Sequence, residues 1–165
     1  YNVVKELKFK QKFLLEYVEK GGNMIVQYNT SRNVDVAAPY TLNLSRDRVT
    51  DEFAEVRILA KDNSLLNFPN KITDEDFKGW VQERGLYFPG SWSDEYIPIF
   101  SMNDKGETAK NGSLLIAKYG KGNYMYTGLS FFRELPAGVS GAYKLFANML
   151  SVGKENIKIK EEIKK

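Results

Sequence analysis

The stretch LLEYVEKGGNMIVQY, residues 14–28, joins a helical pattern, a pair of glycines and a short apolar run. Gly21 and Gly22 end the helical pattern, and residues 24–28 form a nearly continuous apolar run of the kind buried on both faces of a parallel sheet. A helix, a glycine pair and a buried strand in this order predict an α/β fold. Upstream, apolar side chains fall near one stripe at helical spacing, with lysines and glutamates opposite. They are Val4, Leu7, Phe13, Leu14, Tyr17 and Val18.

A helix that leads into a parallel strand normally follows an earlier strand, because the right-handed βαβ crossover covers such a sheet. We therefore expect that the fold lacks its first strand or strands, and that the chain is a fragment of a longer protein. Residues 1–153 are predicted to form one domain, and residues 154–165 a charged tail.

Two further elements have clear signals. Residues 113–119 and 123–129 are β-rich runs joined through Gly120 and Gly122, which predicts a hairpin. A helix with a core-facing stripe is predicted to begin near Ser140 and to end at Gly153. Weaker signals indicate strands at 40–44, 53–59, 85–89 and 96–102, a helical turn at 65–69 and a short acidic helix at 74–80 capped by Thr73.

The chain of 165 residues contains no cysteine and no histidine. Without them it can build no thiol nucleophile, no serine-histidine relay, no His or Cys zinc site and no disulfide. A hydrophobic fraction of 42% supplies enough side chains for the core of one domain.

The net charge of +3 resides mostly in the tail, since the residues up to Gly153 include 19 basic and 18 acidic side chains. These signs are interspersed, so a nucleic-acid partner is not expected. No apolar run approaches the roughly 20 residues that cross a bilayer, so we expect a soluble protein with no membrane span. The lack of cysteine assigns no compartment.

Four stretches, residues 14–29, 79–90, 119–122 and 126–136, resemble the C-terminal domain of PIG-L/LmbE-type bacterial deacetylase proteins. The likeness spans nearly all of residues 1–153. It implies a flavodoxin-like, class I glutamine amidotransferase-like fold. Such a fold has a mostly parallel sheet, helices on both faces and, here, a C-terminal antiparallel hairpin. It also implies an upstream deacetylase domain in the same polypeptide, and is compatible with an exported or periplasmic protein.

In the catalytic relatives a cysteine follows a buried strand on a sharp turn. Here the corresponding strand leads to Asn29 and Thr30, and neither is a thiol. The resemblance therefore implies a non-catalytic accessory or ligand-binding domain that needs no cofactor, with a glycan or amino sugar as its ligand. A purely structural inter-domain module is the alternative.

Trp80, Glu83, Arg84, Tyr87 and Trp92 form the richest local constellation. Aromatic platforms with an arginine and a carboxylate suit a sugar or another polar ring. The alternative is that the tryptophans fill the edge of the core while the charged residues pair with each other.

Phe131, Phe132, Arg133 and Glu134 follow the last predicted strand, and they could contact a neighbouring domain. Exposed phenylalanines would favour that interface, whereas buried ones would indicate simple packing. The polar turn at residues 46–48 could hold an anion or form a local salt bridge.

Adjacent acids at 74–76 and 94–95 leave open a carboxylate-based hydrolase that acts on glycans. Acids at a helix start mostly complement the helix dipole, however. No stretch matches the spaced acids of an EF-hand, and no metal site is predicted.

Overall fold

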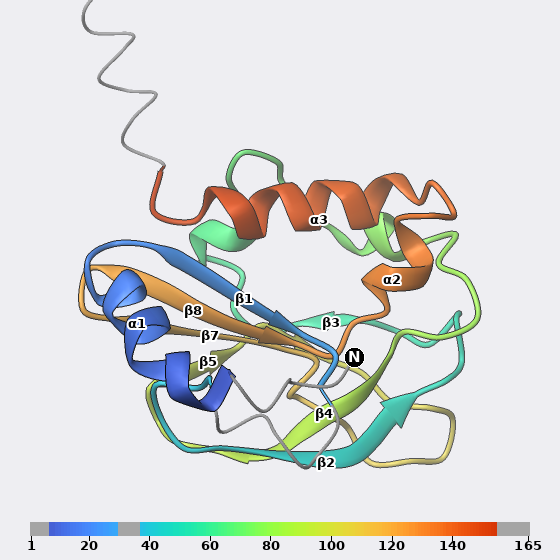
Figure 1. The fold of residues 1–165 in the computed structure, drawn as a ribbon. Coiled ribbons are helices and arrows are strands. Elements are labelled where there is room, and N and C mark those ends of the chain that lie inside the picture. The colour runs from blue at the N-terminus through green and yellow to red at the C-terminus, as the bar shows by residue number, and fades with distance from the viewer. Residues whose placement is uncertain (1–6, 30–36, 155–165) are drawn as a thin grey trace, which may run out of the picture.

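A computed structural model describes residues 7–29 and 37–154 of the chain. Figure 1 shows a small sheet with the helix α3 along one side and a two-stranded ribbon along the other. In chain order the elements are α1 (Leu7–Glu19), β1 (Asn23–Gln27), β2 (Leu42–Val49), β3 (Arg57–Ile58), η2 (Ser64–Leu66), η3 (Asp74–Phe77), β4 (Gly85–Trp92), β5 (Tyr96–Pro98), β6 (Phe100–Ser101), β7 (Leu114–Tyr119), β8 (Gly122–Thr127), α2 (Phe131–Glu134) and α3 (Ser140–Ser151).

The fold is mixed α/β, with small sheets that are mostly antiparallel. The main sheet has the order β1-β8-β7-β5, and β1 runs parallel to β8 from Asn23 opposite Asn123 to Gln27 opposite Thr127. The other strand pairs of the described residues are antiparallel. The predicted mostly parallel sheet is therefore wrong. An apolar run indicates that a strand is buried, but it does not indicate the direction of the neighbouring strands. The turn between β7 and β8 is too short for the crossover that parallel strands need, so these two strands pair antiparallel.

The two faces of the main sheet carry separate cores. One face packs against α3 through Leu145 and Met149, together with Ile116 and Met125 of the sheet. The opposite face carries a second core, to which Leu42 of β2 contributes. That face is covered largely by the β2-β4 ribbon (Figure 1). The prediction of helices on both faces of the sheet therefore holds for the face that α3 covers, whereas a strand ribbon covers most of the other face.

The connection between α1 and β1 has the predicted order of helix, glycine pair and strand. Gly21 has a φ of +116°, which ends the helix. Val18 of α1 is buried, whereas Phe13 and Tyr17 of the predicted stripe are 62% and 58% exposed. The strand β1 is only half-buried because it lies at the edge of the sheet, which corrects the expectation of a strand buried on both faces.

The predicted hairpin and C-terminal helix are confirmed. Gly120, with φ +57°, occupies the turn between Tyr119 and Gly122, the last paired residues of β7 and β8. The acidic helix predicted at 74–80 is the short 3₁₀ helix η3, which begins at Asp74 after the capping residue Thr73 and ends at Phe77. The strand predicted at 53–59 is reduced to two residues, β3.

The strands β2 and β4 extend through segments that the sequence predicts as loops. β2 continues to Val49, and β4 continues to Trp92. Their register is irregular, because Asp47 opposes Phe88 while Val49 opposes Gly85. Two residues of β4 thus face one residue of β2, which is a β-bulge at residues 86–87.

The start of β4 crosses the carboxyl end of β8 at very close range. The amide of Leu86 donates to the Gly128 carbonyl at 2.9 Å, and the amide of Ser130 donates to the Arg84 carbonyl at 3.1 Å. A Cβ on Gly85 would lie 2.4 Å from the Gly128 oxygen, so the crossing requires glycine. As a result, residues 83–87 lie beside residues 128–134, which are more than forty positions later in the chain.

Candidate functional site

Three aromatic rings meet at the carboxyl ends of the parallel strands β1 and β8. The ring of Tyr28 lies 5.4 Å from that of Tyr87 and 4.5 Å from that of Phe132, both edge-on. Tyr28 and Tyr87 are half-buried and Phe132 is 47% exposed, so the cluster faces solvent in part. We call these three residues the aromatic cluster.

The backbone is strained at both tyrosines of the aromatic cluster. Tyr28 has a φ of 53° and Tyr87 a φ of 55°, in the left-handed region that bulky residues avoid. Such a conformation costs about 1–3 kcal/mol and occurs preferentially at functional sites. At Tyr87 the strain coincides with the bulge in β4, and bulges beside functional sites reorient side chains.

A buried hydroxyl fixes both strained turns. The phenol of Tyr126, in β8, donates to the Tyr87 carbonyl at 3.0 Å and lies 3.4 Å from the Asn29 carbonyl. Tyr126 is fully buried. The two segments that carry the tyrosines are therefore attached to the same rigid strand.

A charged pair borders the aromatic cluster. Nε of Arg133 donates to the Glu83 carboxylate at 2.8 Å, and the guanidinium lies 4.9 Å from the centre of the Phe132 ring. The hydrogen bond to Glu83 raises the pKa of Arg133. Arg133 is partly exposed and keeps further N–H donors beyond Nε, which suit a polar ligand resting on the rings.

The structure separates the five residues of the predicted constellation. Glu83 and Tyr87 belong to the site just described. Trp80 is 3% exposed, contacts Phe77 at 5.4 Å between ring centres and donates from Nε1 to the Asp76 carbonyl. It packs in the core, where it has no surface to offer a ligand.

Arg84 is also buried, at 5% exposure. Its Nε and Nη2 donate to the Ala54 carbonyl at 3.1 and 2.8 Å, and its Nη1 donates to the Phe77 carbonyl. Burial lowers the pKa of its guanidinium. Arg84 therefore bonds to the backbone, and the expected pairing of Arg84 with Glu83 is replaced by Arg133 with Glu83.

Trp92 lies at the opposite end of β4 from Tyr87. Five residues of a strand span roughly 16 Å, and Trp92 packs against the second core beside Leu42. It is half-buried, so it belongs to another part of the surface from the aromatic cluster.

The predicted nucleophile position falls only partly on described residues. Asn29 is 8% exposed, and Thr30 lies outside the described residues. The sharp backbone turn is at Tyr28, one residue before Asn29. Tyr28 was missing from the predicted site, although its place at the end of an apolar run was visible in the sequence.

The predicted interface segment is divided between core and surface. Phe131 is 1% exposed and packs against Trp80, whereas Phe132 is 47% exposed. The phenylalanines of α1 have a larger exposed fraction, because Phe9 and Phe13 are 80% and 62% exposed. An apolar patch at the predicted place is therefore limited to Phe132.

Glu134 is fully buried, and Oε2 accepts the Val81 amide at 3.0 Å while Oε1 has no hydrogen-bond partner among the described residues. Burial raises the pKa of this carboxyl, although the Val81 amide and the nearby Arg84 oppose the change. A raised pKa is one requirement of a catalytic acid. However, a side chain with no exposed surface cannot reach a substrate.

Glu134 makes a pH-dependent contribution to stability. Because its pKa is raised in the folded chain, the unfolded chain releases its proton first, and the native state loses stability as pH rises from about 4. We expect Glu134→Gln to gain stability relative to the wild type between pH 4 and pH 8. Urea unfolding at both pH values measures this change, and a constant difference between the two proteins would contradict it.

The other predicted acids have ordinary structural roles. Asp76 accepts the Thr73 amide at 2.9 Å and Lys144 Nζ at 2.7 Å. Burial raises its pKa, but these hydrogen bonds outweigh burial and leave it below the usual value. Asp94 and Glu95 are exposed. The described residues contain no group of three or more metal-binding side chains close enough to hold an ion.

Residues 46–48 form part of β2 and not a loop. Both arginines are exposed, and Asp47 pairs with Lys110 at 3.6 Å instead of with either of them. None of the helices in the described ranges is long and apolar enough to cross a membrane.

Comparison with known proteins identifies no family. No protein-family model matches the chain, and no curated protein matches it. Among solved structures, the cytoplasmic protein STM3548 from Salmonella typhimurium is similar, with a TM-score of 0.54 and 14% identity over 86% of this chain and 58% of that one. A β-galactosidase from Rahnella sp. R3 matches with a TM-score of 0.49 and 14% identity, over 93% of this chain.

The chain spans only 58% and 22% of these two proteins, less than two thirds of either. At 14% identity the likeness to STM3548 shows a shared fold and nothing about activity. The weaker likeness to the β-galactosidase supports no inference about this chain.

Proposed function

We propose that this chain is a non-catalytic ligand-binding module whose aromatic cluster, with Arg133 and Glu83, binds a sugar or amino-sugar ring. The observation that carries the proposal is the meeting of Tyr28, Tyr87 and Phe132 at the carboxyl ends of β1 and β8. In α/β folds, ligands bind preferentially outside the carboxyl ends of parallel strands. Aromatic faces stack on sugar rings, while an arginine and a carboxylate direct hydrogen bonds to hydroxyl or amino groups.

Strain and rigidity support this assignment. The chain maintains two left-handed tyrosines at the site, at a cost that ring packing alone does not require. Tyr126 holds both turns from a buried strand, so the rings are positioned before a ligand arrives. Preorganised platforms lose little entropy on binding.

The absence of catalysis in this proposal rests on the chemistry of the residues. The chain has no cysteine and no histidine, and the sharp turn after β1 carries Tyr28, which is not a thiol and has no histidine to activate it. A class I glutamine amidotransferase-like fold that has lost its triad accounts for these features. The association with a PIG-L-type deacetylase domain rests on the sequence resemblance alone, and the residues encoded before Tyr1 would test it.

The proposal predicts that removing either ring weakens binding without unfolding the chain. We expect Phe132→Ala and Tyr87→Asn each to raise the Kd for an amino sugar about tenfold, equivalent to about 1.4 kcal/mol. Asparagine tolerates the left-handed backbone at position 87 better than alanine. Titration calorimetry measures the Kd, and the melting temperature of Phe132→Ala should stay close to the wild-type value.

The matched control is Phe53→Ala, which removes another exposed phenylalanine, 81% exposed and in a different segment. Its affinity should equal that of the wild type. Equal affinities for Phe132→Ala, Tyr87→Asn and the wild type would rule out the aromatic cluster as the binding site. If no sugar binds at all, the structural inter-domain role becomes the better explanation.

A further inference from the structure

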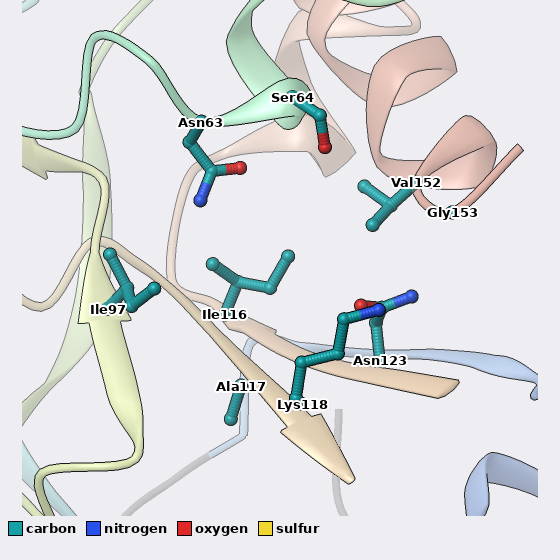
Figure 2. Close-up of a pocket in the computed structure, with 9 residues that line it drawn as sticks. All are labelled: Asn63, Ser64, Ile97, Ile116, Ala117, Lys118, Asn123, Val152 and Gly153. Atoms are coloured by element: carbon teal, nitrogen blue, oxygen red, sulfur yellow. The ribbon is translucent and has the colours of Figure 1, made fainter. Parts of the chain in front are cut away.

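A cavity lies beside the end of β7 and the beginning of β8, away from the aromatic cluster. It has a volume of about 290 Å³ and lies between the main sheet, η2 and the C-terminal end of α3. Figure 2 shows side chains from all three sources directed toward one hollow. Its lining residues are Asn63, Ser64, Ile97, Ile116, Ala117, Lys118, Asn123, Val152 and Gly153.

Strand register places the floor of the cavity on one face of the sheet. Ile97 of β5 is the cross-strand partner of Ile116 in β7. Lys118, two residues further along β7, is the partner of Asn123 in β8. Cross-strand partners and alternate residues share a face, so these four side chains form a floor that is apolar at one end and polar at the other.

The roof also combines apolar and polar groups. Val152 points into the hollow from the end of α3, and Ser64 faces it from η2 (Figure 2). Two carbonyls at the end of α3 already accept hydrogen bonds: the Asn23 side chain donates to the Val152 carbonyl at 2.7 Å, and the Lys154 amide donates to the Ser151 carbonyl at 3.0 Å. Because these carbonyls already have donors, they compete little with a ligand for the hydrogen-bond donors at the polar end of the cavity.

Lys118 alone carries a charge among the described residues that line the cavity. Its side chain is exposed and has no ion pair with any carboxylate of the described ranges. In Figure 2 it rises from the sheet beside Asn123, at the polar end of the floor. A lysine at the polar end of a hollow whose other end is apolar is suited to an anionic head group on an apolar chain.

We propose that this cavity binds a small aliphatic carboxylate, with its carboxylate on Lys118 and its chain between Ile97, Ile116 and Val152. A volume of about 290 Å³ is at the lower end of the range of small-molecule sites. Octanoate, an eight-carbon carboxylate, represents this class of ligand. The site is independent of the proposed sugar-binding function, and either can fail without the other.

The test is a titration of the protein with octanoate, octanamide and octylamine, followed by NMR shifts of backbone amides. These three ligands have nearly the same length and differ in charge. We expect octanoate to bind at least fivefold more tightly than octanamide and octylamine not to bind, with shifts at residues 116–118 and 152–153. Equal affinity for octanoate and octylamine, or shifts elsewhere on the chain, would overturn the proposal.

Two variants test the two halves of the cavity separately. Lys118→Gln should reduce octanoate affinity to that of octanamide, whereas Lys105→Gln, at another exposed lysine, should not. Ile97→Trp fills the apolar end and should abolish binding of both ligands. Ile97 is 48% exposed, and the control Leu59→Trp replaces a side chain of 47% exposure elsewhere. Undiminished octanoate binding by Lys118→Gln or by Ile97→Trp would refute the assignment.

Discussion

Arg84→Met is expected to destabilise the chain by about 3–5 kcal/mol, the usual cost of removing one member of a buried charged network. The guanidinium satisfies the carbonyls of Ala54 and Phe77, and its charge faces the buried Glu134. Methionine fills much of the same volume but leaves both carbonyls and the carboxyl without this partner. Urea unfolding measures the loss.

The same variant decides whether Arg84 is structural or binds a ligand. An arginine that bound a ligand at the surface would change affinity while leaving the free energy of unfolding nearly unchanged. The control is Arg46→Met, at an exposed arginine of β2, where we expect a change within about 0.5 kcal/mol. A loss below about 1 kcal/mol for Arg84→Met would contradict the structural role.

Gly128→Ala is expected to destabilise the chain by about 1–3 kcal/mol and to weaken binding at the aromatic cluster. A Cβ on Gly128 would lie 2.4 Å from the Leu86 carbonyl oxygen and 2.7 Å from Phe88 Cδ1. Relief of this clash requires β4 to move away from β8. Because Tyr87 is carried on β4, its ring would move relative to Tyr28.

Gly90→Ala is the matched control within β4. Its Cβ would approach Ser45 Cβ at 3.0 Å and no backbone atom within 4 Å, so a small adjustment accommodates it. We expect a change of less than about 1 kcal/mol and unaltered affinity. If Gly128→Ala kept the full stability and affinity of the wild type, the close crossing would not determine the position of the site.

Local signals in the sequence predicted the elements that local chemistry controls. The glycine pair at 21–22, the capping residue Thr73 and the hairpin turn at Gly120 fix their elements through nearby backbone geometry. The parallel direction expected of residues 24–28 is confirmed for β1, which runs parallel to β8. The direction of the rest of the sheet was mispredicted, because an apolar run gives no information about the strands beside it. The continuation of β2 through 45–48 depends on pairing with β4, which local composition does not reveal.

The candidate site was predicted in pieces. Glu83, Tyr87, Phe132 and Arg133 were all named from the sequence, but in two separate groups. Their meeting depends on the crossing of β4 over the end of β8, a contact between distant segments. Trp80 and Arg84 were placed in the site because aromatic and charged residues serve cores and ligands equally well, and only burial distinguishes the two uses.

An amide NMR titration of the chain with glucosamine, N-acetylglucosamine and glucose tests sugar binding by the aromatic cluster most directly. We expect saturable shifts for at least one of these sugars, concentrated at Tyr28, Tyr87, Phe132 and Arg133. In the Tyr87→Asn variant these shifts should require about tenfold more sugar. Saturable binding with shifts confined to another surface, or no binding by any of the three sugars, would contradict a sugar-binding role for the aromatic cluster.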